Sequence, residues 1–346
     1  MATSEDQCDA RAKALRDRAR ADPTQVDPIE ALAVLESAEA ADRRAAVAAI
    51  REVTAADPVA TADVLPELLS YLDELSISAQ ADLLASVADV AEVQPTAVAP
   101  HLDPIVERLD DRQPANVLRP AARATAAVAE DHPRVVFAAV PRLAALLGGR
   151  HERCERHALR ALERVAWAYP LEVRPAVENI GVCLDRTDPR TLAIALEALD
   201  HVARLYPLET RGLLDRAGRL VTHPETDVRA NAAALVGDLL RFEPAPSSPV
   251  ARRLVGVLED ENPKVRSNAM AAVGRIGMVS PGLVHANLDA VMAALEDEAA
   301  SVREAACFAL GAAQVTSAKE PLIEVIESDP DEDVCDRAIW AIERLR

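Results

Sequence analysis

The amino-acid sequence predicts an all-α protein, a right-handed α-solenoid of about nine helix pairs, and three observations lead to this prediction. About one residue in five is alanine, the best helix former, whereas aromatic residues make up 2% of the 346 residues and glycines number 11. Prolines recur along most of the chain at a nearly constant spacing. Between them, apolar residues follow the period of an α-helix. An all-β fold is excluded, because it needs β-branched and aromatic runs separated by glycine-rich turns.

The recurring prolines divide the chain into units of similar length. From Pro58 to Pro281, one proline recurs every 37 or 38 residues. Pro23, 35 residues earlier, and Pro321, 40 residues later, extend the pattern toward the two ends. We therefore expect a single solenoid over residues 23–346, preceded by a polar capping helix over residues 1–22. The units begin near Pro23, Pro58, Pro95, Pro133, Pro170, Pro207, Pro244, Pro281 and Pro321.

The half of each unit that precedes the next proline predicts an amphipathic helix of about 15 residues. Apolar residues recur there at i, i+4 and i+7, which is one face of an α-helix. Small alanines at the first of these positions allow neighbouring helices to approach closely. The first position holds Ala46, Leu83, Ala121, Ala158 and Ala195; the second holds Ile50, Val87, Thr125, Leu162 and Leu199; the third holds Val53, Val90, Val128, Val165 and Val202.

The other half of each unit follows the phase proline and predicts the partner helix. In several units a second proline, at Pro66, Pro104 or Pro141, lies a few residues further on. Proline is well tolerated in the first turn of a helix, so these residues mark the start of a main helix after a short lead-in turn. Two helices of about 15 residues and a short turn would fill the repeat.

The later units resemble the second helices of HEAT repeats. They carry TDVRANAAALVG, NPKVRSNAMAAVG and ASVREAACFALG, in which Val228, Val265 and Val302 are spaced by 37 residues. This HEAT- or armadillo-like resemblance implies a scaffold fold and says little about function. It also implies that Arg229, Arg266 and Arg303 form an inter-repeat ladder with acidic residues. The arginine-rich, lysine-poor and acidic composition resembles that of proteins from halophilic archaea, with an acidic protein from a GC-rich bacterium as the alternative.

The sequence contains no motif for catalysis, for a cofactor or for a metal ion. P-loop, GxSxG, GxGxxG and HExxH patterns do not occur. The polar N-terminus and the absence of long uncharged apolar stretches predict a cytoplasmic protein without a membrane span. Five scattered cysteines predict reduced core residues and not a disulfide or zinc framework. They are Cys8, Cys154, Cys183, Cys307 and Cys335.

The net charge of −19 is distributed unevenly along the chain. Residues 58–111 contain one basic and eleven acidic residues, whereas residues 112–164 contain ten arginines and five acidic residues. We predict that arginines on the outward side of two second helices bind an acidic partner, unless acids within the chain neutralise them. Trp167 is a candidate interface anchor, because its equivalents, Glu130 and Arg204, are charged. The predicted partner-binding residues are Arg119, Arg123, Arg153, Arg156, Arg160, Arg164 and Trp167.

Acidic runs recur where we expect the turn between the two helices of a unit. They include residues 258–261, 295–298 and 328–333. Carboxylates there interact favourably with the N-terminal dipole of the following helix and keep the surface hydrated. A row of them could also bind a basic partner or cations.

The preferred function is a non-catalytic protein–protein interaction scaffold or adaptor. A macromolecular partner would bind along the concave face or on the arginine-rich central surface, because stacked repeats create an extended surface. One alternative is a chromosome- or nucleic-acid-associated HEAT subunit that uses the same arginines. The acidic charge of the chain disfavours that alternative. A further alternative is a bilin-lyase-like HEAT accessory protein, which nothing in the sequence specifically supports.

Overall fold

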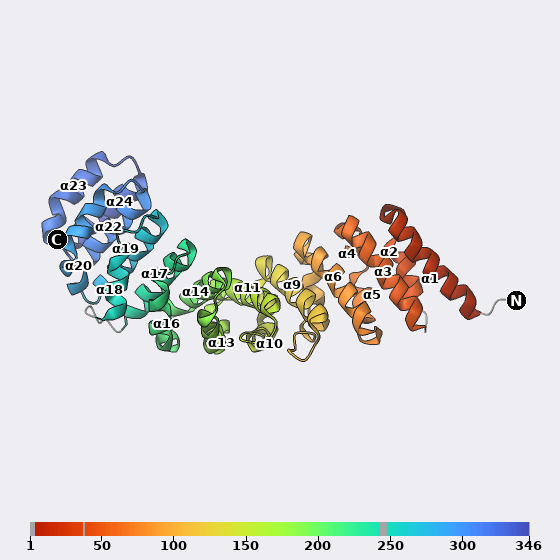
Figure 1. The fold of residues 1–346 in the computed structure, drawn as a ribbon. Coiled ribbons are helices and arrows are strands. Elements are labelled where there is room, and N and C mark those ends of the chain that lie inside the picture. Colours follow the sequence, from red (N-terminus) through yellow and green to blue (C-terminus); the bar gives the residue numbers. More distant parts are fainter. Residues whose placement is uncertain (1–3, 37–38, 243–247, 346) are drawn as a thin grey trace. The chain divides into compact units, whose positions relative to one another are not determined.

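The computed structural model describes residues 4–36, 39–242 and 248–345. The described chain is helical and contains no β-strand, which confirms the all-α prediction. The unit predicted to start at Pro244 begins outside the described residues. The helices form two compact units, Met1–Asn179 (unit 1) and Ile180–Arg346 (unit 2). Within each unit, the second helices of successive repeats pack side by side as a solenoid (Figure 1).

Unit 1 begins with α1 (Ser4–Ala21), which packs against α3 (Ala40–Ala56). Its remaining second helices are α6 (Ile77–Val93), α9 (Ala115–Asp131) and α11 (Glu152–Ala168). All four second helices are 17 residues long. The shorter elements are η1 (Pro23–Gln25), α2 (Pro28–Leu35), α4 (Pro58–Ala62), α5 (Leu65–Ser70), η2 (Leu72–Glu74), α7 (Pro95–Val98), η3 (Ala99–His101), α8 (Asp103–Val106), η4 (Pro133–Ala139), α10 (Val140–Ala145), α12 (Pro170–Val173) and η5 (Arg174–Ala176).

Unit 2 has five second helices in its described residues, and each is 13 or 15 residues long. They are α14 (Pro189–Ala203), α17 (Thr226–Leu240), α19 (Pro263–Gly277), α22 (Ala300–Ala312) and α24 (Glu332–Arg344). The other elements are η6 (Cys183–Asp185), α15 (Pro207–Thr210), η7 (Arg211–Leu213), α16 (Leu214–Leu220), α18 (Pro249–Gly256), α20 (Gly282–Ala286), α21 (Leu288–Ala293), η8 (Ala294–Glu296), η9 (Thr316–Ala318) and α23 (Lys319–Ser328). Helix α13 (Val177–Val182) contains the boundary between the units.

The first half of the repeat is more broken than the sequence predicts. In the repeat that begins at Pro58, the expected helix of about 15 residues is two short helices, α4 and α5, followed by η2. Pro66 lies in the first turn of α5, where it cannot donate the hydrogen bond that would continue α4. Proline also disfavours helical geometry at the residue before it, so each internal proline restarts the helix.

The predicted inward positions of the second helices form the core. Every one of the 15 residues assigned to these positions is at most 4% exposed, including Thr125. Burial of a Val, Leu or Ile side chain contributes about 1.5–3 kcal/mol, so the periodic stripe supplies much of the stability of each unit. Glycine appears where second helices approach most closely. A Cβ on Gly237 would lie 2.3 Å from the Cβ of Ala272 on the next helix.

The ladder implied by the resemblance to HEAT repeats is present in unit 2. Arg229 donates to both carboxylate oxygens of Asp260, at 2.8 and 3.0 Å. Arg266 and Arg303 bind Asp297 and Asp329 in the same bidentate way. Part of the acidic edge is therefore structural: one acid in each run joins adjacent repeats, while neighbours such as Glu261 and Glu298 stay exposed.

Two further expectations concern the cysteines and the membrane. Cys154, Cys183 and Cys307 are buried free thiols, and Cys335 is half-buried. The side chain of Cys8 lies outside the described part of the chain. Among the helices of residues 4–36, 39–242 and 248–345, none combines the length and apolar character needed to cross a bilayer.

Candidate protein-binding surface

The arginines predicted to bind a partner lie on the solvent side of α9 and α11 in unit 1. The inward stripe of α11, which includes Ala158 and Leu162, is buried, so the opposite side faces solvent. We call these side chains the Arg-rich surface. Its exposed members are Arg119, Arg153 and Arg160, and its partly exposed members are Arg123, Arg156 and Arg164.

Half of the Arg-rich surface is paired with acids of the preceding second helix. Arg160 and Arg164 of α11 lie 3.1 and 2.8 Å from the carboxylate of Glu130 on α9. Arg123 of α9 bonds to Asp89 on α6. Acids within the chain thus neutralise these three arginines, as the sequence allowed, and they come mainly from the preceding second helix. Such solvent-accessible pairs contribute roughly 0–1 kcal/mol each, so they hold the arginines in place without contributing much stability.

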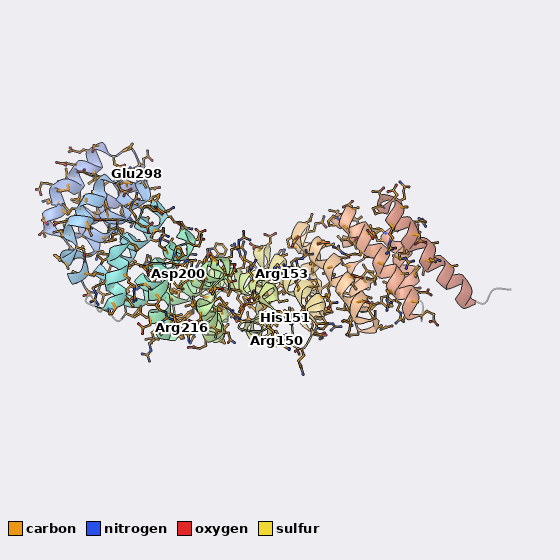
Figure 2. All side chains as sticks on the ribbon, viewed as in Figure 1. Arg150, His151, Arg153, Asp200, Arg216 and Glu298 are labelled. Carbon is orange, nitrogen blue, oxygen red and sulfur yellow. The ribbon has the colours of Figure 1, made fainter. Side chains whose placement is uncertain are left out.

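Arg119 and Arg153 differ from the paired arginines. Both are exposed, and within the described residues neither makes a hydrogen bond or an ion pair. Nearby, Arg150 is 76% exposed in its side chain; its Nη2 lies 3.7 Å from the carboxylate of Asp111 and donates to the backbone oxygen of Asp111 at 3.5 Å. Figure 2 shows Arg150, His151 and Arg153 at the start of α11 and the turn before it. Arg119 and Arg153 therefore present guanidinium groups whose hydrogen-bonding capacity is available to a partner.

An open cleft of about 470 Å³ lies between the N-terminal ends of α9 and α11. The cleft is lined mainly by basic and polar residues. They are Ala115, Asn116, Arg119, Arg150, His151, Glu152, Arg153 and Cys154. The positive field extends along the helix to His157. Burial lowers the pKa of His157 to about 4, and Arg119, Arg123 and Arg156 lower it further in the same direction, so this imidazole is neutral at physiological pH.

Two more clefts continue along the same face of unit 1. One, of about 440 Å³, lies between α6 and α9 and is lined in part by Arg51, Arg119 and Arg123. The other has the same volume and is lined by α6, α9 and α11, including Arg123 and Arg160. Arg119 and Arg123 are each shared by two clefts, so the three form one groove across successive second helices. Such a groove can receive an extended segment better than a small substrate.

Trp167, at the end of α11, is 65% exposed. It follows Arg160 and Arg164 at the i+7 and i+3 positions, which places it on the same side of the helix. Tyr169 instead contacts the ring of Phe137 edge to face, with 4.9 Å between ring centroids. Trp167 therefore adds a large apolar side chain at the end of the Arg-rich surface, while Tyr169 packs at the turn between repeats.

A family model described as HEAT repeats matches residues 288–346. This part of the chain is therefore similar to HEAT repeats. It runs from α21 to α24 and includes the Arg303–Asp329 pair of the ladder. No curated protein is significantly similar to the chain in sequence.

Solved structures of the karyopherin Kap121p are similar in fold. The complex with Pho4p has a TM-score of 0.50 at 16% identity, and the match covers 97% of this chain and 40% of that one. The complexes with the C-terminus of the phosphatase Cdc14p and with Nup53p have TM-scores of 0.47 and 0.48, at 16% and 17% identity and the same coverage. The chain thus spans less than half the length of these karyopherins. At this identity, the likeness to the Pho4p complex supports the α-solenoid fold alone.

One polar cluster in unit 2 was missed by the sequence analysis. Asp200 and Asp238 lie on adjacent second helices and are almost fully buried. The sequence did contain a signal for this cluster, because Asp200 occupies the repeat position that holds Gly237, Gly274 and Gly311 in the following units. Packing favours a small residue where two helices approach closely, so it does not explain a charged residue at this position.

Proposed function

We propose that this protein is a non-catalytic interaction scaffold that binds an acidic segment of a partner protein along the Arg-rich surface of unit 1. The observation that carries the proposal is the pair of exposed cations without acidic partners, Arg119 and Arg153, on the two sides of an open cleft. A positive patch on a strongly acidic protein attracts an acidic partner and orients it during encounter. Kap121p, which has a similar fold, is seen bound to protein partners such as Pho4p.

Trp167 supports a protein partner over a nucleic acid. Exposed tryptophan is enriched among residues that dominate binding energy in protein interfaces. The net charge of −19 repels a uniformly charged polyanion, whereas a short acidic segment meets only the local arginines. We infer that the arginines select the acidic segment and that Trp167 contacts an apolar side chain within it.

We also propose that residues 23–346 form a single solenoid, which works in the cytoplasm of a halophilic archaeon. The unbroken repeat of prolines supports the single solenoid. The excess of acidic residues and the presence of only three lysines, Lys13, Lys264 and Lys319, support the halophilic origin.

The proposal can be tested with a labelled peptide of alternating Glu and Asp that contains one central Leu. We expect the full chain to bind it, and the double variant Arg119→Glu/Arg153→Glu to weaken binding by about tenfold or more. The matched control is Arg134→Glu/Arg142→Glu, which makes the same charge change at exposed arginines of η4 and α10. Binding is measured by fluorescence anisotropy over a range of KCl concentrations.

Two results would contradict the proposal. Equal losses of affinity in the test and control variants would mean that only net charge matters. Tighter binding of a single-stranded oligonucleotide of equal charge, lost in the same double variant, would favour the nucleic-acid alternative.

A further inference from the structure

Unit 2 buries two carboxylates that face each other from neighbouring second helices. Asp200 on α14 is 5% exposed, and Asp238 on α17 is 1% exposed (Figure 2 labels Asp200). Burying a carboxylate is costly unless cations or hydrogen-bond donors compensate it. A pair in one place therefore calls for a functional or structural reason.

Two arginines compensate this pair only in part. Arg204 donates to one oxygen of Asp200 at 2.5 Å, and its Nε lies 3.7 Å from Asp238. Arg275 of α19 places its Nε 3.1 Å from Asp238 and donates from Nη2 to the carbonyl oxygen of Ala234. The second oxygen of Asp200, Oδ1, is buried and receives no hydrogen bond from the described residues.

This carboxylate lines a small pocket of about 170 Å³ on the second helices of unit 2. Asn231 and Asn268 also line it, and each donates its side-chain amide to a backbone carbonyl of the preceding helix, at 3.1 and 2.9 Å. One of the two N–H donors of each amide is therefore used, and the amide carbonyl oxygens remain as acceptors. The full lining is Glu197, Asp200, His201, Arg204, Asn231, Ala234, Asn268 and Arg275.

When Asp200 is ionised and the imidazole of His201, which also lines the pocket, is neutral, the charges around the pocket leave one negative charge in excess. Glu197, Asp200 and Asp238 carry three negative charges, and Arg204 and Arg275 carry two positive charges. Glu197 is exposed and makes no ion pair in the described chain, and a carboxylate oxygen of Glu197 lies within 4.8 Å of a ring nitrogen of His201. A ligand that matches this pocket has one positive charge and several N–H donors.

We propose that the pocket of unit 2 receives the guanidinium group of an arginine side chain presented by a partner protein. Guanidinium has five N–H donors in a fixed plane and is weakly hydrated, so it can serve several acceptors from three helices at once. The titration of Asp200 agrees with this assignment. Burial raises the pKa of Asp200 to about 6; Arg204 opposes that rise, and Asp238 adds to it. A bound guanidinium would stabilise the ionised form and displace the proton.

This site is separate from the Arg-rich surface, because its lining residues come from α14, the residue that follows α14, α17 and α19. Its ligand has the opposite charge to the acidic segment proposed for unit 1. Either proposal can therefore fail without the other.

The test uses the full chain and the peptide acetyl-Gly-Gly-Arg-Gly-Gly-amide, followed by saturation-transfer NMR and titration. We expect saturable binding that weakens about tenfold or more in Asp200→Asn and in Glu197→Gln. The matched controls are Asp227→Asn and Glu298→Gln, which remove exposed carboxylates elsewhere in unit 2. Binding should strengthen as the pH rises from 5 to 7.5, through the pKa of Asp200, about 6.

Several outcomes would overturn the assignment. They are the absence of binding, equal affinity in Asp200→Asn, and equal loss in the control variants. Binding of K⁺ or Mg²⁺ that excludes the peptide and is itself lost in Asp200→Asn would also overturn it, because the pocket would then be an inorganic cation site. Circular dichroism and the fluorescence of Trp340 establish that each variant is folded.

Discussion

Replacing Asp297 by alanine should destabilise unit 2, because this carboxylate joins two successive repeats. Its two oxygens accept hydrogen bonds from Arg266, at 2.8 and 2.7 Å, and one of them accepts from the backbone N–H of Ala299 at 2.9 Å. The side chains of Arg266 and Asp297 are only 12% and 14% exposed. The substitution removes the acceptor and leaves a largely buried guanidinium without its main partner.

The magnitude follows from the bonds lost and the bonds kept. A hydrogen bond to a charged group contributes about 1.5–3 kcal/mol, and breaking a fully buried ion pair costs about 3–5 kcal/mol. Arg266 keeps its bonds to the backbone carbonyls of Asp260 and Glu261, at 3.0 and 3.2 Å. We therefore expect the free energy of unfolding of unit 2 to fall by about 2–3 kcal/mol.

Unit 2 can be observed selectively, because the chain has two tryptophans and only Trp340 lies in this unit. In a Trp167→Phe background, urea unfolding followed by Trp340 fluorescence reports on α24, where the ring lies 5.5 Å from that of Phe308. Urea is preferred to guanidinium chloride because it adds no salt to screen the ion pairs. At a typical slope, the midpoint should move down by about 1 M.

The control for this experiment is Glu298→Gln, which changes the neighbouring carboxylate. Glu298 is 84% exposed and lies 3.6 Å from Arg266, so its removal should cost less than about 0.5 kcal/mol. If Asp297→Ala shifts the midpoint no more than this control does, the ladder does not stabilise the unit and the reasoning is wrong.

Four further predictions concern packing, the titration of two carboxylates and the candidate anchor. Gly237→Ala should destabilise unit 2 by about 1–3 kcal/mol in the same urea assay, since the new Cβ would overlap Ala272. Bonds from Arg303 lower the pKa of Asp329, so the stability from this pair is present above the unfolded pKa of about 3.9 and should be lost as the pH falls below it. The pKa of Asp200 is instead raised to about 6, so the stability that protonated Asp200 contributes is present below its unfolded-state pKa and is lost as the pH rises through 6. Asp200→Asn should abolish this loss of stability, as measured by urea titrations at pH 5 and pH 8. Trp167→Ala should change the free energy of unfolding, followed by circular dichroism, by less than about 0.5 kcal/mol, while weakening binding of the Leu-containing acidic peptide.

Most of the helical framework could be predicted from the amino-acid order alone. Whether a residue on a second helix faces the core depends on its angular position, and the i, i+4, i+7 pattern records that position directly. Ala158, Leu162 and Val165 are buried as predicted for this reason. The ladder arginines were also foreseen, because Arg229 and its equivalents recur at one position and the resemblance to HEAT repeats implies that they pair with acids there.

The length of the first helices was predicted less well. Their apolar content favours helix, but Pro66 and its equivalents restart the helix, and the balance depends on how each fragment packs against its second helix. Local propensity and tertiary packing compete there on similar energy scales, so the fragment boundaries were not evident from the sequence.

By itself, the sequence determined the repeat length, the second helices, the buried stripe and the outward direction of the arginines, because each is a periodic property of one helix. Only the tertiary structure decided that Arg160 meets Glu130, that Arg119 and Arg153 remain without acidic partners, and that the buried carboxylates of Asp200 and Asp238 interact. The physical reason is that ion pairs between helices act over a few ångströms. They depend on the axial offset of neighbouring helices and on side-chain rotamers, which a repeat pattern does not specify.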